Sequence, residues 1–204
     1  YVLNWTGSVQ VAPDTITNGT HKLPAFALPI HEADPGKALD LWKTQCAMKG
    51  GKVSGSDPYR STPILVDGLG AAPVVVMATT AKDKQLGGTR MLVTYALNDS
   101  VPAPDAASAQ QAAHDLALAL NRAVVMEQIA DQRKIISDRI DKLEKTILSD
   151  AGKAVLKKVT EARVGYVREQ DRYIETLKSG NFELAAGLLA GDLRKAQTDY
   201  IGSI

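Results

Sequence analysis

The chain has 204 residues, of which 45% are hydrophobic and 23% charged, so it is long enough for one large or two small packed domains. Its 24 basic and 23 acidic side chains leave a formal net charge of +1, which excludes a strong overall field attracting nucleic acid or an anionic membrane surface. We therefore expect no nucleic-acid partner. No stretch approaches the roughly 20 apolar residues that span a bilayer, so any membrane attachment is expected outside these residues.

The sequence before about Pro104 is rich in Gly, Pro, Thr and Val, and it predicts a small β-sheet domain with one helix. Residues 1–11 are predicted to form a strand, and the proline-containing residues 12–30 a loop. The helix should begin with Asp34 as N-cap and Pro35 at the first position, and end at Gly50-Gly51. Its expected apolar face is Ala38, Leu41, Trp42, Cys46 and Met48. Three further strands are predicted over Ile64–Val66, Val74–Thr79 and Thr89–Leu97.

After Pro104 helix-forming residues dominate, and a helical pattern runs from about Asp105 to Ser149. At ~1.5 Å per residue this helix would be about 65 Å long, so its second half must pack away from a small sheet domain. Breaks at Asp150-Ala151-Gly152 and Ser179-Gly180-Asn181 predict two more helices that pack antiparallel to their neighbours, with Gly180 as a C-terminal cap and Asn181 as an N-cap. The expected apolar positions of the long helix are Leu116, Leu120, Val124, Ile129, Ile136, Ile140, Leu143 and Ile147.

These elements predict an α+β fold. A small β-sheet domain with one packed helix, residues 1–104, is joined by a long helix to an antiparallel helical bundle, residues 105–204. The change of composition near Pro104 places the boundary.

The chain contains no nucleotide-binding glycine loop, no nucleophile elbow and no zinc-protease motif. The stretch from His31 to Asp34 offers potential metal ligands, but Asp34 is better explained as the cap of the helix that follows, with Glu32 near the positive end of that helix. Cys46 is the only cysteine, which excludes an intramolecular disulfide, and its place on the apolar face suits a small buried hydrophobe better than a nucleophile. We therefore predict no catalytic residues, no metal site and no cofactor.

Arginine and tyrosine side chains on the predicted bundle indicate a different kind of site. Arg163 and Tyr166 are three residues apart and share a helix face, while Arg172 and Tyr173 lie two to three turns further along. A guanidinium holds a carboxylate through two hydrogen bonds, and a tyrosine adds a hydroxyl on a rigid apolar ring. These four residues are the predicted site for a small carboxylate or amino-acid ligand. The alternative is that the arginines pair on the surface with Glu161, Glu169 or Asp171.

Residues 135–204 also carry an ordered set of short segments typical of one family. The chain over Ile135–Ile204 resembles the periplasmic four-helix-bundle sensor domain of bacterial methyl-accepting chemotaxis receptors. The matching segments are Arg139–Lys145, Gly152–Leu156, Glu161–Tyr166, Asp171–Tyr173, Gly180-Asn181, Ala185–Leu189 and Ala196–Tyr200. They correspond in order to the second, third and fourth helices of that bundle.

The resemblance implies an extracytoplasmic, bacterial and periplasmic sensor that dimerises through its helices and binds small amino acids or organic acids between them. In that family arginines hold the ligand's carboxylate, and Arg163 is the position that matches best. The first helix of the family has no counterpart, because an α+β domain stands in its place. That N-terminal part resembles uncharacterised exported bacterial proteins, on Lys49–Val53, the later strands and Ala113–Asn121.

Three functions therefore remain open. The first is a sensor that binds a small ligand between helices and signals by helix displacement. The second is a structural or interaction protein of the cell envelope whose bundle drives oligomerisation. The third, an enzyme, would need a polar cluster of His31, Asp34 and Cys46, and we predict that the protein is not an enzyme.

Overall fold

The computed structural model describes residues 8–179 and 182–204, and it confirms the α+β class. Packing divides the chain into two compact units, residues 1–127 and residues 128–204, which we call the sheet unit and the helical unit. The long helix α2 (Ala106–Thr146) contributes its first half to the sheet unit and its second half to the helical unit. The division at 104/105 follows composition and remains a prediction, whereas the packing units meet inside α2.

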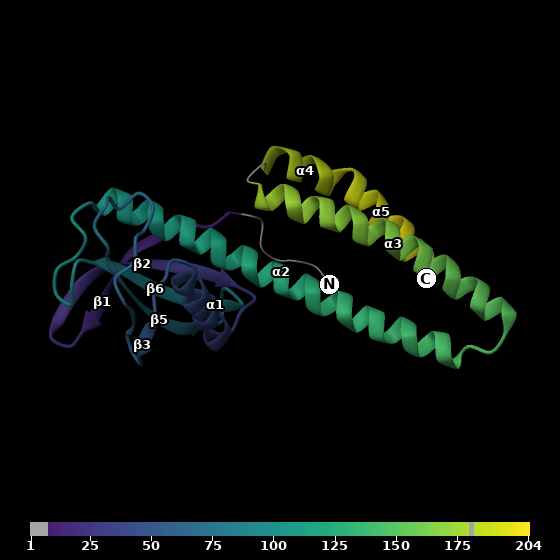
Figure 1. The fold of residues 1–204 in the computed structure, drawn as a ribbon, viewed down its shortest axis with the longest axis horizontal. Helices are drawn as coiled ribbons and strands as arrows, with labels where there is room; N and C mark the ends of the chain where they lie inside the picture. Colours follow the sequence, from purple (N-terminus) through teal and green to yellow (C-terminus); the bar gives the residue numbers. More distant parts are fainter. Residues whose placement is uncertain (1–7, 180–181) are drawn as a thin grey trace. The chain divides into compact units, whose positions relative to one another are not determined.

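The sheet unit is built on one six-stranded antiparallel sheet in the order β1-β2-β6-β5-β4-β3 (Figure 1). Helix α1 (Pro35–Met48) connects β2 to β3. One face of the sheet packs against α1 and the first half of α2, in a core that includes Trp42, Val76, Val93 and Leu120. The strands are β1 (Ala12–Asn18), β2 (His21–His31), β3 (Val53–Gly55), β4 (Tyr59–Ser61), β5 (Val75–Asp83) and β6 (Gly88–Ala96).

Helix α1 begins as the sequence predicts. The Asp34 carboxylate accepts a hydrogen bond from the Lys37 backbone N–H at 2.9 Å, and Pro35 occupies the first helical position. Four residues of the expected apolar face are buried: Ala38, Leu41, Trp42 and Cys46. The fifth, Met48, was wrongly predicted to be buried; it is 75% exposed because the helix ends there, beside Lys49 and Gly50.

The loop predicted over residues 12–30 is wrong, because these residues form the hairpin of β1 and β2. Proline is rare in paired strands because it has no N–H to donate. Here the carbonyl oxygens of Pro24 and Pro29 accept hydrogen bonds from the side chains of Thr94 and Asn121, at 2.6 and 2.8 Å. The hairpin signal was Asn18-Gly19, where Gly19 has a φ of 60°.

Other strand predictions need smaller corrections. The strand predicted over residues 1–11 lies mostly outside the described residues, and β1 begins only at Ala12. Ile64 makes a single bridge to Val74 rather than starting a strand. The strands β3 and β4 were not predicted, because three polar-rich residues each are too short to show an alternating pattern. The last two predicted strands are confirmed as β5 and β6.

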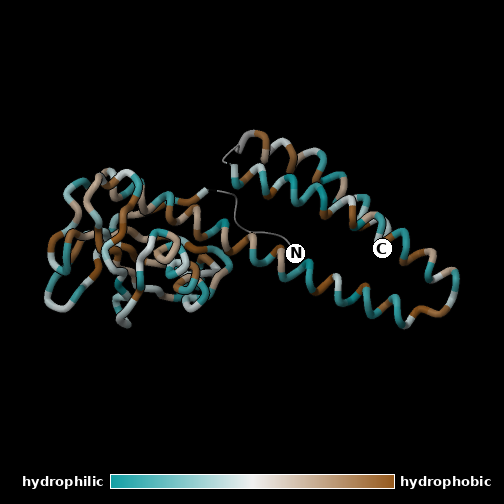
Figure 2. The backbone as a smooth tube through the Cα atoms, viewed as in Figure 1, coloured by the Kyte–Doolittle hydropathy of each residue, from teal (hydrophilic) through white to brown (hydrophobic). Residues whose placement is uncertain are grey.

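The helical unit contains the second half of α2, then α3 (Asp150–Lys178), α4 (Phe182–Ala190) and α5 (Asp192–Gly202). Helices α4 and α5 run back along α3 (Figure 1). Hydrophobic and hydrophilic residues alternate along these helices, as expected when one face is buried (Figure 2). The buried apolar side chains include Ile140, Leu156, Ile174, Leu193 and Tyr200.

The helix boundaries predicted for the helical unit require two corrections. The first lies at residues 147–149 rather than 150–152, because the Ser149 hydroxyl caps α3 by accepting from the Gly152 N–H at 3.2 Å. The last helix is not continuous, since Gly191 separates α4 from α5 with a φ of −105° and a ψ of −102°. Within the described residues four helices thus follow β6, where three were predicted. The predicted caps Gly180 and Asn181 lie outside the described residues.

Candidate ligand-binding site of the helical unit

Helices α3 and α5 frame the candidate site. The rings of Tyr166 on α3 and Tyr200 on α5 stack with their centroids 5.7 Å apart and their planes 14° from parallel. The Tyr166 hydroxyl accepts a hydrogen bond from the Gln170 side-chain amide at 2.8 Å, one turn along α3. Partial burial raises the pKa of Tyr166, so its hydroxyl stays neutral at physiological pH.

A groove of about 330 Å³ lies between these two helices, and we call it the α3–α5 groove. Its apolar lining comes from Ala162, Gly165, Tyr166 and Ala196, where small side chains leave room between the helices. Its charged lining has two cations and three carboxylates: Arg168, Lys195, Glu169, Asp192 and Asp199. The groove lining therefore carries a formal charge of −1.

The cations of the groove are already paired with its carboxylates. Lys195 Nζ lies 2.6 Å from Asp199 Oδ2, and this hydrogen bond raises the pKa of the lysine. Arg168 Nε lies 3.2 Å from Glu169 Oε1. The Glu169 side chain is only 14% exposed, so its charge interacts with neighbours through less water than those of the other acids. An anionic ligand would have to displace one of these carboxylates from its cation.

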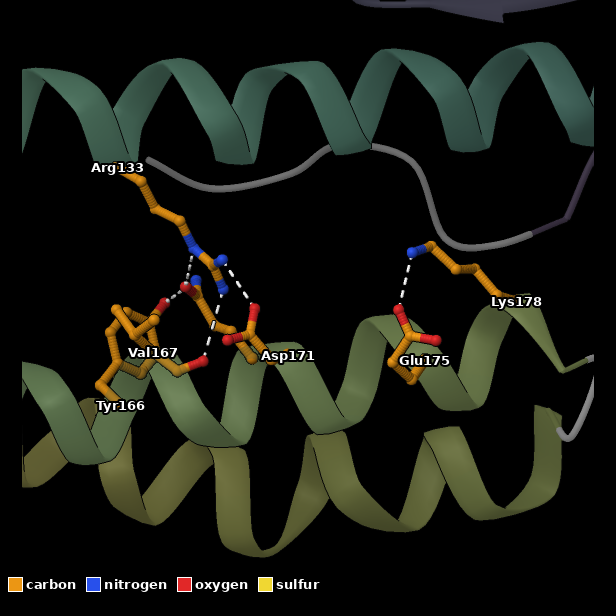
Figure 3. A network of polar contacts seen from close by, with 7 residues as sticks. Arg133, Tyr166, Val167, Asp171, Glu175 and Lys178 are labelled. Carbon is orange, nitrogen blue, oxygen red and sulfur yellow. Dashed lines mark hydrogen bonds and ion pairs between the residues drawn. The ribbon is translucent and has the colours of Figure 1, made fainter.

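Arg133 on α2 connects that helix to α3 through three donors (Figure 3). Its Nη1 lies 2.7 Å from Asp171 Oδ1, its Nε donates to Gln170 Oε1 at 3.0 Å, and its Nη2 contacts the Val167 carbonyl at 3.4 Å. The Gln170 side-chain amide in turn donates a hydrogen bond to the Tyr166 hydroxyl. A chain of hydrogen bonds thus runs from α2 to a side chain that lines the α3–α5 groove.

Arg163, the best-matched residue of the predicted site, turns toward α2. Its Nη2 donates to the Arg133 carbonyl oxygen at 3.0 Å and lies 2.8 Å from Ser137 Oγ. Both contacts are partly buried. Arg163 does not line the α3–α5 groove, although it shares a helix with Tyr166.

The other predicted residues lie at different places on α3. Arg172 is at the groove's edge, where its Nη1 lies 3.1 Å from Asp192 Oδ2 and 3.6 Å from Glu169 Oε2. This is the surface pairing with Glu169 that the sequence offered as an alternative. Tyr173 is half-buried, and burial raises the pKa of its hydroxyl. Of the four predicted residues, Tyr166 alone lines the groove, and a shared site for all four remains a prediction.

Sequence reasoning missed Arg133 and the acidic residues of α5. Arg133 lies seven residues before buried Ile140, so the helical period placed it on the same inward side of α2. The spacing of Arg133 and Ile140 could therefore have predicted that Arg133 faces the interior of the helical unit. Asp199 and Lys195 are four residues apart on α5, which is typical of an exposed ion pair and gave no hint of a groove.

The other residues considered from the sequence, Asp34 and Cys46, have structural roles in α1. Asp34 caps α1, as described above. Cys46 is buried, and burial raises the pKa of its thiol from 9.0 to about 11, so it is a poor nucleophile at neutral pH. Across residues 8–179 and 182–204, no three His, Cys, Asp or Glu side chains are grouped closely enough to hold a metal ion. Nor does any described helix have the length and apolarity needed to cross a membrane.

A family model described as a four helix bundle sensory module for signal transduction matches residues 119–204, which is less than half of the chain. This match confirms the resemblance to chemotaxis-receptor sensor domains seen over residues 135–204. It supports a sensory role for the helical unit, and the family is a signalling module rather than a catalytic one. No curated protein and no solved structure matches the chain.

Proposed function

We propose that the protein is an extracytoplasmic, periplasmic sensor whose helical unit binds a small amino acid in the α3–α5 groove. The observation that carries this proposal is the groove's lining, which places cations and carboxylates on two neighbouring helices around the Tyr166 ring. The match of residues 119–204 to a sensory module supports the sensor class.

The charge of the lining favours an amino acid over a dicarboxylate. Three carboxylates against two cations attract an ammonium group and oppose a second negative charge on the ligand. An α-amino acid carries one charge of each sign, so its ammonium group would contact Glu169 or Asp199 while its carboxylate contacts Lys195 or Arg168. Each such exchange replaces one ion pair by another and leaves no charge without a partner.

The four residues of the predicted site have different roles in this proposal. Tyr166 provides the apolar surface on which the ligand rests. Arg172 acts at the edge of the groove, because a ligand carboxylate can replace Asp192 beside its guanidinium. Arg163 and Tyr173 act on α3 itself, where Arg163 holds the helix to α2 through Arg133 and Ser137.

The signal would travel as a displacement of α3. A ligand that changes the spacing of α3 and α5 moves Tyr166 and Gln170, and Gln170 is bonded to Arg133 on α2. Such a ligand shifts the protein between two arrangements only by its difference in affinity for them. In this proposal the hydrogen bonds of Arg133 connect the groove to α2 through Gln170 and Tyr166, and those of Arg163 connect α3 to α2.

The test is a thermal-shift and calorimetric screen of the full chain against amino acids, dicarboxylates and tricarboxylates. A ligand at a hundred times its dissociation constant adds about 2.7 kcal/mol of stability. We expect amino acids to give the shift, and Lys195→Gln to weaken it at least tenfold. The matched control is Lys157→Gln, since Lys157 is 77% exposed, pairs with Glu161 on the same helix and lies outside the groove.

Arg163→Ala separates direct contact from transmission. If Arg163 reaches the ligand, the variant loses ligand-induced stabilisation while it still folds. If it acts only through α2, the ligand still binds and the helix displacement is lost. Stabilisation by dicarboxylates alone, or binding unchanged by Lys195→Gln, would contradict the groove assignment.

A second candidate function, an oligomerisation module of the cell envelope, is favoured by a specific observation. Large apolar side chains of the helical unit are exposed to solvent, for example Leu148 at 85%, Ile204 at 80% and Val164 at 66%. A second copy of the chain would cover such residues, as the predicted homo-oligomer requires. Sedimentation equilibrium tests it: a dimer that Val164→Glu dissociates supports this function, and a monomer at all concentrations contradicts it.

A further inference from the structure

The sheet unit contains a second cavity, unconnected with the proposed sensor function. It has a volume of about 170 Å³ and lies between α1, the sheet and the first half of α2. Most of its lining is apolar and comes from Trp42 and Cys46 on α1, Val76 on β5, and Ala112, Leu116 and Ala119 on α2. The cavity is open to solvent on the side of Asp67, whose side chain is 99% exposed, so a small molecule can reach it.

One polar group stands out in this lining. Tyr95 on β6 is only 4% exposed, and it lines the cavity. Within the described residues its hydroxyl has no hydrogen-bond partner, although the Tyr95 backbone carbonyl accepts one from Ala103. The hydroxyl oxygen is not fully enclosed, so it can contact water or a ligand in the cavity, and a ligand with a hydrogen-bond acceptor would take the place of that water. Burial raises the pKa of Tyr95, so the hydroxyl keeps its proton and can donate.

The charged groups that line the cavity make polar contacts with their neighbours. Lys49 Nζ lies 2.8 Å from Asp67 Oδ2, and this contact holds the pKa of Asp67 below its ordinary value. The Asp115 carboxylate accepts a hydrogen bond from the Gln111 side-chain amide at 2.9 Å. A charged ligand of either sign would lose its hydration in a mainly apolar space, so the cavity selects against charge.

We propose that this cavity binds a neutral, mainly apolar molecule the size of a single ring, whose one polar atom accepts a hydrogen bond from the Tyr95 hydroxyl. The size follows from comparison: an apolar cavity of about 150 Å³ takes up benzene. Such a site combines an apolar lining with a single polar group that fixes the ligand's orientation. In this proposal the sheet unit contains its own ligand-binding site, separate from the α3–α5 groove.

Phenol and toluene are the probes, because they share size and shape and differ only in a hydroxyl and a methyl group. Calorimetry and saturation-transfer nuclear magnetic resonance on the full chain measure binding of each. We expect phenol to bind at least several-fold more tightly than toluene. The Tyr95→Phe variant should lower the affinity for phenol about tenfold and leave that for toluene unchanged, since one neutral hydrogen bond is lost.

A second variant tests the location without touching the hydroxyl. Ala119→Leu should abolish binding of both probes by filling the cavity, whereas Ala123→Leu should not. Ala123 is likewise half-buried, one turn further along α2, and does not line the cavity. Lys195→Gln, in the α3–α5 groove, should leave phenol binding unchanged, so this test is independent of the sensor proposal.

Two outcomes overturn the proposal. One is the absence of phenol binding at millimolar concentration, or phenol binding that survives Ala119→Leu. The other is phenol affinity that is equal in the wild type and in Tyr95→Phe, which overturns the assignment of the hydroxyl. Circular dichroism and the thermal midpoint confirm that each variant is folded.

Discussion

The rings of Tyr166 and Tyr200 stack 5.7 Å apart and hold α3 against α5 beside the α3–α5 groove. Tyr200 is buried, and Tyr166 is also bonded to Gln170, which accepts from Arg133 on α2. One aromatic pair therefore joins the last helix of the chain to a polar network that reaches α2. Any ligand that separates α3 from α5 must act on this pair.

The stacked pair should contribute a measurable coupling energy. A double-mutant cycle of Tyr166→Leu and Tyr200→Leu is expected to give about 0.5–1.5 kcal/mol, because stacked aromatic rings add that much beyond the area they bury. Urea unfolding of the helical unit measures it. Tyr166→Phe is the control, since it keeps the ring and removes only the hydroxyl that accepts from Gln170. Additive single-variant effects would show that the stack contributes nothing specific.

Arg133 should not be replaceable by lysine. Its guanidinium contacts Asp171, Gln170 and Val167 at once, and a lysine ammonium on a flexible stem cannot match that planar geometry. Arg133→Lys is expected to destabilise the helical unit by about 1–2 kcal/mol, since its hydrogen bonds involve a charged donor and its side chain is only 28% exposed. Chemical denaturation measures this change.

The matched control for that variant is Arg139→Lys on the same helix. Arg139 is exposed, and the structure records no hydrogen bond or ion pair from its side chain to the described residues. We expect a change within about 0.5 kcal/mol at this position. Equal effects at Arg133 and Arg139 would mean that the network in Figure 3 does not stabilise the fold.

Leucines on the two halves of α2 should respond differently to truncation. Leu120 has no exposed surface and packs in the sheet unit's core, whereas Leu143 is 45% exposed in the helical unit. Leu120→Ala is expected to cost about 2–5 kcal/mol through lost burial and the cavity left behind. Leu143→Ala should cost less than about 1 kcal/mol, because part of its surface is already in water. Thermal unfolding of both variants makes the comparison, and the reverse order would contradict the burial of α2 described above.

The sequence predicted helices well where a cap and an apolar period coincide. Asp34 with Pro35 located the start of α1, and the apolar spacing of α2 anticipated its length within a few residues. It failed where local chemistry and tertiary contacts disagree. Pro24 and Pro29 argue against a strand locally, yet β2 is paired along both of its edges, with β1 and with β6, which lies far along the chain. Such long-range partners cannot be read from the neighbouring residues.

The candidate site was predictable only in part. Tyr166 was identified from its spacing to Arg163, and it does line a groove. Spacing along one helix gives a shared face, but it does not reveal which neighbouring helix that face meets. Arg163 therefore contacts α2 while Arg172 pairs with Asp192 on α5. Asp192 and Asp199 line the groove from α5, which begins after the break at Gly191, and the sequence prediction of a continuous last helix did not include that break.

Cys46 should make the stability of the sheet unit fall at high pH. Burial raises the pKa of its thiol from 9.0 to about 11 in the folded protein, so the unfolded chain loses this proton first as the pH rises. Below pH 9 both states are protonated and the group has no effect. Between pH 9 and 11 the folded state binds more protons, and the free energy of unfolding decreases as the pH rises.

The rise of the thiol pKa from 9.0 to about 11 corresponds to a loss of roughly 2–3 kcal/mol in the free energy of unfolding once the pH reaches 11. Urea unfolding at several pH values between 8 and 10.5 should show a steeper decline for the wild type than for Cys46→Ala. Because lysines and tyrosines titrate in both proteins, the difference between the two curves isolates the thiol. Parallel curves would mean that Cys46 ionises as easily in the folded state as in the unfolded chain, and hence that water reaches its sulfur through the cavity that it lines.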